Sequence, residues 1–243
     1  PRGVREAARQ ARGAMSAPVF LAGEGTLDGV EVGDLYVLDG TEGRHAGIVQ
    51  RRGEGERVDV VDGLGVRLET LVEATSSHGL ELRVVARSIE PAPDPAFVLV
   101  QALAKGDRDE LAVEAATELG VDVVVPWHAQ RSIVVWRGQR AAKSQARWRA
   151  TVRSAVKQSR RARKPLVEDA VDLRALVRRV EGAVAAGGVA LVLHETASAR
   201  TGPPCPRSSC AMTGALRRPA IRSMSPNMFR PSRRWHLSRL MRP

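Results

Sequence analysis

Cysteine is absent from residues 1–204, and the two cysteines of the chain, Cys205 and Cys210, lie near its end. A disulfide framework or a thiolate metal site therefore cannot form within residues 1–204. The C-x4-C pair has no second pair and no histidine at metal-ligand spacing, so no zinc site is indicated. This use of cysteine is typical of the reducing cytosol, and we expect a cytoplasmic location.

Long apolar runs are lacking as well. No segment approaches the roughly 18–20 apolar residues that span a bilayer, so no membrane helix is expected. The first residues are charged but contain no hydrophobic stretch, which argues against a signal peptide. We interpret Met15 as the start of the protein and residues 1–14 as an upstream extension.

Acidic residues are missing from the last part of the chain. Residues 196–243 contain ten arginines, seven prolines and no Asp or Glu, which leaves a net charge of only +1, out of +11, for residues 1–195. The high overall charge is therefore no evidence for a nucleic-acid partner. Because this segment has hardly any periodic apolar face to offset the entropy of ordering, we predict that residues 196–243 are disordered.

Several catalytic signatures are also absent. The chain has no G-x-S-x-G, no Walker loop and no G-x-G-x-x-G after its first α/β strand. A Rossmann-type dinucleotide or methyl-donor site is therefore not supported. No metal-ligand spacing relates the histidines of the body, which are His45, His78, His128 and His194. No residue can be assigned a catalytic role.

What is present begins with a β-rich segment, residues 17–90. Apolar and charged residues alternate in "GVRLETLVEA" and in "LELRVVA", and turn signals such as "RRGEGE" and "DGLG" separate the runs. Short strands at this spacing predict a small barrel or sandwich. The three prolines of residues 91–95, "PAPDP", then predict a stiff linker.

Beyond the linker the pattern is that of an α/β domain. The apolar run 97–104 predicts a strand that is buried on both faces. A helix follows, with Asp107 as its cap, Glu110 in a capping box and Gly120 at its end. Its residues Leu111, Ala115 and Leu119 share one face. The run "VDVVVP", ended by Pro126, predicts a second parallel strand, and hence a β-α-β unit.

Two further helices are expected, at about 139–162 and 172–180, and then another buried strand at 189–195. In open α/β sheets the ligand crevice lies beyond the carboxyl ends of the strands. The segment expected to complete such a site here would follow residue 195.

One segment of residues 1–195 is strongly basic. Residues 131–167 contain twelve Lys or Arg and no acidic residue. At helical spacing, Trp148, Val152, Ala155 and Ser159 form one stripe, and the opposite side carries a row of cations. This basic row consists of Arg149, Arg153, Lys157, Arg160 and Lys164. Such a row suits contacts with nucleic-acid phosphates, and the alternative is a solvated helix face.

Two segments, "KGDRDELAVEAATELGVD" (105–122) and "AVKQSRRARKP" (155–165), together resemble the ribosomal RNA small subunit methyltransferase E family. Residues 43–65 are similar to the PUA-like RNA-binding β-barrel of that family, and the resemblance covers about residues 17–195. It implies an α/β fold with a PUA-like barrel at 15–90, a linker at 91–95 and an incomplete SPOUT-type domain, the trefoil-knot class, at 96–195. It also implies a homodimer.

The resemblance implies an enzyme that methylates uridine N3 in 16S ribosomal RNA of the small subunit, with S-adenosylmethionine as cofactor. The RNA-binding residues expected from it and from the basic row are His45, Arg51, Lys105, Arg108, Arg149, Arg153, Lys157, Gln158, Arg160 and Arg161.

The family carries a Gly-Pro-Glu-Gly-Gly loop and a knot-forming stretch after the strand that "VALVLHE" matches. Neither motif occurs in residues 196–243. We therefore expect no residues that bind the cofactor in this chain, and we interpret the tail as out of frame; an authentic divergent tail is the alternative. The rival functions are a non-catalytic RNA-binding protein, which would use the barrel and the basic helix, and a dimerisation subunit.

Overall fold

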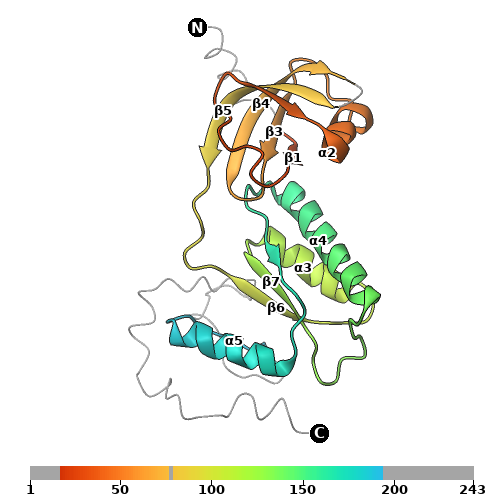
Figure 1. The fold of residues 1–243 in the computed structure, drawn as a ribbon, viewed down its shortest axis with the longest axis vertical. Coiled ribbons are helices and arrows are strands. Elements are labelled where there is room, and N and C mark those ends of the chain that lie inside the picture. The colour runs from red at the N-terminus through yellow and green to blue at the C-terminus, as the bar shows by residue number, and fades with distance from the viewer. Residues whose placement is uncertain (1–16, 77–78, 194–243) are drawn as a thin grey trace, which may run out of the picture. The chain divides into compact units, whose positions relative to one another are not determined.

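The computed structural model describes residues 17–76 and 79–193 (Figure 1). The predictions for residues 1–14 and 196–243, the expected disorder of the tail among them, lie outside the described residues.

A curled sheet of five strands forms the first part of the chain. The strands are β1 (Val19–Leu21), β2 (Leu35–Leu38), β3 (Arg57–Val61), β4 (Val66–Thr75) and β5 (Leu80–Ile89). Their order is β1-β3-β4-β5-β2; β1 runs parallel to β3 and the other pairs are antiparallel. A short helix, α2 (Gly40–Arg44), and one turn of π-helix, η2 (His45–Val49), lie between β2 and β3.

The predicted alternation along β4 and β5 is confirmed. Leu68 and Val72 on β4 and Leu80 and Leu82 on β5 are at most 1% exposed, because they face the interior of the curled sheet. Arg67 on β4 points the other way, and its side chain is 16% exposed. Burial of every second residue is expected for a strand whose sheet has one covered face.

The turn between β3 and β4 is held by Asp62. Its Oδ1 accepts hydrogen bonds from the backbone N–H groups of Leu64, Gly65 and Val66 at 2.7, 3.0 and 3.0 Å. Gly65 has a φ of +119°, and a Cβ there would lie 2.7 Å from the guanidinium of Arg163. Only glycine lets the turn come so close to that side chain. The turn predicted from "DGLG" is thus confirmed.

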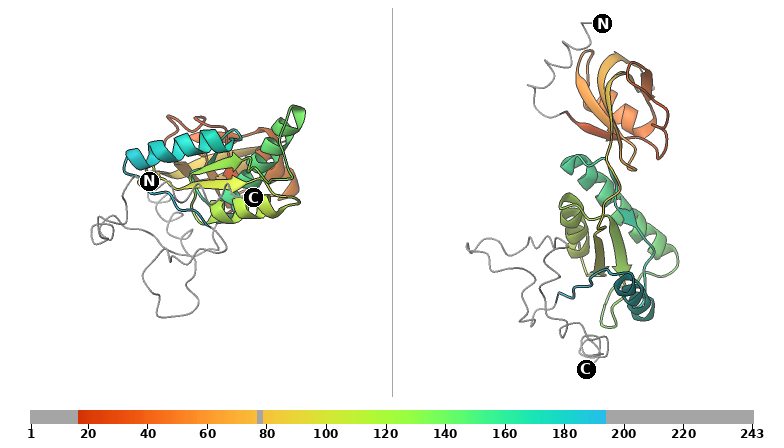
Figure 2. Two further views of the ribbon diagram at one scale, coloured as in Figure 1. Left: turned by 90° about the horizontal axis from the view of Figure 1, so that it is seen from below. Right: turned by 90° about the vertical axis from the view of Figure 1, so that its left-hand side faces the viewer.

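A second sheet, wholly parallel, follows residues 90–97, which lie in neither helix nor strand. Its strands are β6 (Val98–Ala102), β7 (Val123–Trp127) and β8 (Leu166–Val167), in that order. The helix α3 (Arg108–Glu118) joins β6 to β7, which confirms the predicted β-α-β unit. α3 and α5 (Leu173–Ala185) lie on opposite sides of this sheet (Figure 2).

Both strands of this unit differ from the prediction. β6 is not buried on both faces: Val98 is 47% exposed and the rest of the strand is half-buried, because β6 lies at the edge of the sheet. β7 continues through Pro126 to Trp127, since that position leaves the strand pairing intact. A run of apolar residues in the sequence does not show whether the strand lies at the edge or in the centre of a sheet.

The start and the buried face of α3 also differ. The Asp107 side chain makes no capping bond; the carboxylate of the buried Asp109 instead accepts from the N–H groups of Ala104 and Glu110. The face of Leu111 and Leu119 is exposed, and Val113 and Thr117 are buried in its place. Helical spacing alone does not say which of two neighbouring stripes meets the core.

The next helix, α4 (Gln139–Ser159), ends three residues earlier than expected because Arg160 adopts the left-handed conformation, with φ at 56°. α5 extends further than expected, to Ala185, and Asp172 caps its start: Oδ1 of Asp172 accepts from the N–H of Ala175 at 2.7 Å.

The expected buried strand at 189–195 is contradicted where it is described. Residues 188–193 belong to no strand and are exposed, with Leu193 at 89%. An apolar run becomes a strand only where a neighbouring strand accepts its backbone hydrogen bonds, and no such pairing is present among residues 17–76 and 79–193. His194 and Glu195 lie outside the described residues.

None of the helices in the described ranges is both long enough and apolar enough to cross a membrane.

Candidate nucleic-acid interface

The position of α4 is set by one apolar stripe. Trp148, Val152 and Val156 are each at most 1% exposed and pack with β1 and β7 in one core. Trp136, in the loop before the helix, meets Trp148 edge-on, with ring centroids 5.1 Å apart at 77°. Such an arrangement adds to the stabilisation from the area that the two rings bury. The packing stripe predicted for α4 is thereby confirmed.

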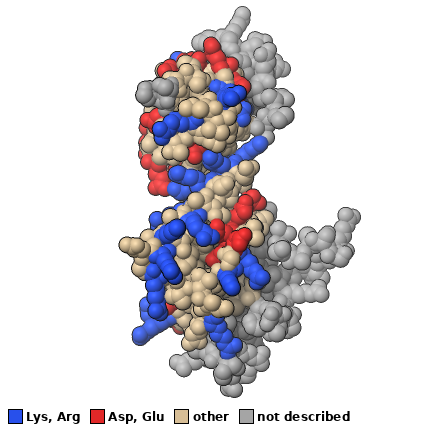
Figure 3. Space-filling model, turned by 90° about the vertical axis from the view of Figure 1, so that its right-hand side faces the viewer, with Lys and Arg blue, Asp and Glu red and all other residues tan. Residues whose placement is uncertain are grey.

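The opposite side of α4 carries exposed cations. Arg149, Arg153 and Arg160 are exposed, and their guanidinium groups have no hydrogen-bond or ion-pair partner in the part of the chain that the structure describes. Figure 3 looks onto this side of the molecule, where Lys and Arg side chains gather. A row of unpaired guanidinium groups attracts anions, because each can donate several hydrogen bonds to phosphate oxygens.

The other two members of the predicted row are already paired. Lys157 Nζ lies 3.2 Å from both carboxylate oxygens of Glu42, on α2. Lys164 Nζ lies 2.7 Å from Glu24 Oε1, in the turn after β1. Both acids lie more than 100 residues away in sequence, so the helical pattern could not reveal these pairs.

A groove of about 570 Å³ runs along this surface. One wall is α4, with Arg149, Ala150 and Arg153, and the other is the segment that leads into β8. The lining residues of that second wall and of the adjoining turn are Lys164, Pro165, Leu166, Val167 and Glu24. The lining of the groove therefore combines three cations and one carboxylate with apolar side chains, and its cations suit contacts with phosphates.

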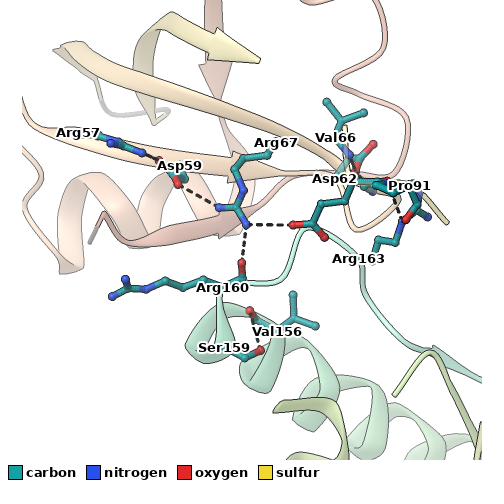
Figure 4. A network of polar contacts seen from close by, with 12 residues as sticks. Arg57, Asp59, Asp62, Val66, Arg67, Pro91, Val156, Ser159, Arg160 and Arg163 are labelled. Atoms are coloured by element: carbon teal, nitrogen blue, oxygen red, sulfur yellow. Dashed lines mark hydrogen bonds and ion pairs between the residues drawn. The ribbon is translucent and has the colours of Figure 1, made fainter. Parts of the chain in front are cut away.

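Polar contacts from the curled sheet fix the end of α4 beside this groove (Figure 4). Arg67 on β4 donates to the carbonyl oxygen of Arg160 and, at 3.0 Å, to Asp59 Oδ2. Arg163 donates from Nε and Nη2 to the carbonyl oxygens of Glu90 and Pro91 at 2.7–3.1 Å. Neither arginine was expected to have this role.

Arg161 differs from its neighbours in the basic segment. Its guanidinium donates to the carbonyl oxygens of Thr117 and Val121 at 2.9 and 2.6 Å and to Asp122 at 3.3 Å. The side chain is only 16% exposed. In this structure Arg161 joins the ends of α3 and α4, and it does not share the exposed face.

The remaining sequence-predicted residues occupy other positions. Lys105, in the loop after β6, and Arg108, at the start of α3, are exposed, and Gln158 is on α4. His45, in η2, lies 3.2 Å from Gln50 Nε2 in a side-chain hydrogen bond, and Arg51 is exposed with φ at 50°. Of the ten predicted residues, Arg149 and Arg153 line the groove.

The sequence of this chain is similar to those of known RNA methyltransferases. The model of a family described as an RNA methyltransferase domain matches residues 91–206. The ribosomal RNA small subunit methyltransferase E of Mycobacterium bovis is 45% identical over 170 residues, 70% of this chain and 65% of that protein. This chain therefore spans only about 65% of the length of that relative.

Two solved structures have a similar fold. A ribosomal RNA small subunit methyltransferase E of Neisseria gonorrhoeae, bound to S-adenosylmethionine, is 28% identical with a TM-score of 0.56, over 67% of this chain and 65% of that one. A putative methyltransferase of Legionella pneumophila, also bound to S-adenosylmethionine, has a TM-score of 0.59 over 68% and 66%. At 24% identity the second shows likeness of fold alone.

Proposed function

We propose that this chain, which is 45% identical over 170 residues to a ribosomal RNA small subunit methyltransferase E, is a member of that family and binds 16S ribosomal RNA through the groove beside α4. The observation that carries this proposal is the row of Arg149, Arg153 and Arg160, which is exposed and unpaired in the described part of the chain. A helix face that only needs to be solvated usually mixes charges of both signs, whereas this face has cations alone.

The reaction that the family resemblance implies, for a chain with a complete donor site, is methylation of a uridine at N3 in the small ribosomal subunit, in the cytoplasm. S-adenosylmethionine would supply the methyl group on its sulfonium, and the uridine N3 would take it after losing its proton. The part of this chain's own residues in that reaction is to hold the RNA. We assign the curled sheet to a PUA-like RNA-binding module at 15–90 and residues 96–195 to a SPOUT-type domain joined to it by the linker at 91–95.

The described residues offer no fit for the methyl donor where the family resemblance would put it. Residues 188–193 precede the expected donor loops, and they are exposed and belong to no strand in the described ranges. Residues 196–243 lack the Gly-Pro-Glu-Gly-Gly sequence. We propose that this chain binds RNA but neither holds the methyl donor nor transfers methyl groups.

The test of RNA binding uses two double variants with equal loss of charge. Arg149→Ala/Arg153→Ala removes two cations four residues apart on α4. Arg174→Ala/Arg178→Ala removes two cations at the same spacing on α5. Binding of a labelled 16S RNA fragment is measured by fluorescence anisotropy over a range of salt concentrations.

The α4 variant should lower the slope of log affinity against log salt by about 0.7–0.9 for each phosphate that the protein no longer neutralises. The α5 variant should leave the slope near that of the unaltered protein. Equal slopes in all three proteins would refute the assignment of RNA binding to this groove. The cations of α4 would then be interpreted as a solvated helix face.

A further inference from the structure

Within the groove, one cation is held by an acid from a distant part of the chain. Lys164 and Glu24 are 140 residues apart, and the 2.7 Å between Nζ and Oε1 is the length of a charge-assisted hydrogen bond. Both side chains line the same groove as Arg149 and Arg153. One carboxylate therefore shares a groove with three cations, and it has the same sign of charge as the phosphate of a bound RNA.

The electrostatics of Glu24 agree with this geometry. The hydrogen bond from Lys164 holds the pKa of the Glu24 carboxyl below its usual value of 4.5, and the charge of Lys164 lowers it further; burial opposes these effects, and the charge of Arg153 contributes least. The carboxylate is therefore ionised at neutral pH. Arg153, which makes no hydrogen bond to Glu24, still acts on it through space.

The two partners differ in how firmly they are held. The backbone N–H of Lys164 donates to Gly63 O at 2.8 Å, and its neighbour Arg163 is bound to Glu90 and Pro91. Glu24 lies in a turn between two glycines, and its side chain is 58% exposed. The backbone of Lys164 is thus fixed beside the groove and its side chain is 25% exposed, while the 58% exposed carboxylate of Glu24 is free to turn toward solvent.

The second ion pair of the row serves as a contrast. Glu42, which pairs with Lys157, is only 16% exposed, and Lys157 is 26% exposed. Neither side chain lines the groove. This pair has the features of a structural contact between α2 and α4, and a phosphate could not reach Lys157 without first displacing a largely buried acid.

We infer that Lys164, Arg149 and Arg153 form a phosphate subsite that the Glu24 carboxylate occupies in the free protein and leaves when RNA binds. This inference rests on the proposed RNA-binding function. Glu24 would then be an internal competitor: it weakens contacts with any single phosphate and favours chains that engage several cations of the groove at once.

The test removes the competitor and keeps its shape. Glu24→Gln should bind a labelled single-stranded RNA more tightly than the unaltered protein, several-fold at low salt, with the gain fading as salt rises. Glu73→Gln is the matched control, because Glu73 is also exposed and also 2.7 Å from a cation, Arg83, on the curled sheet away from the groove. The control corrects for the loss of one negative charge.

A double-mutant cycle assigns the effect to Lys164. In the Lys164→Met background, Glu24→Gln should give little or no gain. Thermal unfolding of each variant verifies that the fold is retained.

A gain no larger than that of Glu73→Gln, or a gain that persists without Lys164, would overturn the subsite. The proposed function is judged separately: it fails only if Arg149→Ala/Arg153→Ala also leaves RNA binding unchanged. If Glu24→Gln alone gives no gain in RNA affinity, the competitor role of Glu24 is refuted, but the proposal of RNA binding stands.

Discussion

Arg67, on β4, donates a hydrogen bond to the carbonyl oxygen of Arg160, the left-handed residue that ends α4. The two residues are 93 positions apart. The same guanidinium is paired with the buried Asp59. The end of the basic helix is thus fixed by a side chain of the curled sheet, and the direction in which the row of cations points depends on this hydrogen bond.

Arg67→Met should therefore destabilise the protein by about 1–3 kcal/mol, because it leaves a carbonyl oxygen and part of a buried carboxylate without their donor. The measurement is urea denaturation followed by circular dichroism. Arg83→Met, which removes the exposed pair with Glu73 and the hydrogen bond to the carbonyl oxygen of Gly33, should cost less than Arg67→Met. Equal costs for the two variants would show that the Arg67 hydrogen bond does not fix α4.

Arg160→Gly should separate stability from binding. Glycine adopts the φ of 56° seen here without steric cost, so the variant should be more stable by about 0.5–1 kcal/mol. It also loses an exposed guanidinium, so its RNA affinity should fall. Arg160→Ala is the control: it loses the same charge but keeps the strained backbone, and it should gain no stability. A stability gain in both variants would mean that the left-handed conformation is not the cause.

Glu24 should titrate below the usual value for a glutamate. The pKa of its carboxyl, followed by NMR of the side-chain carbon, is expected below 4.5 in the unaltered protein and closer to 4.5 in Lys164→Met. Because the native pKa is lowered, the stabilising effect of the pair is present above 4.5 and is lost as the pH falls through the native pKa. With Glu24 so exposed, solvent screening keeps this effect small. An unchanged titration in Lys164→Met would contradict the pair.

This chain should not bind S-adenosylmethionine. Isothermal titration calorimetry should give no saturable heat, whereas a version with the family's Gly-Pro-Glu-Gly-Gly segment restored after residue 195 should bind. RNA binding by the two versions should be similar, because the groove beside α4 lies wholly within the shared residues. Saturable binding by the unaltered chain would show that residues 196–243 supply a working donor site.

The sequence by itself determined the elements whose signal is local. The alternation at Leu68 and Leu82 predicted β4 and β5, because one face of a sheet must be buried whatever it packs against. The stripe of Trp148 and Val152 predicted the buried side of α4 for the same reason. The unbroken series of cations on the opposite side, and the two motifs of the family, pointed to RNA before any contact was known.

Only the tertiary structure decided which charges are free. Lys157 and Lys164 look like Arg149 and Arg153 in the sequence, yet each meets an acid from a segment more than 100 residues away. It also decided that Arg161 joins two helices, that Leu111 and Leu119 face solvent and that residues 189–193 form no strand. Burial and ion pairing depend on neighbours that the whole fold brings together. Helical or strand periodicity predicts which side of an element a residue occupies, but it does not predict which residues face that side.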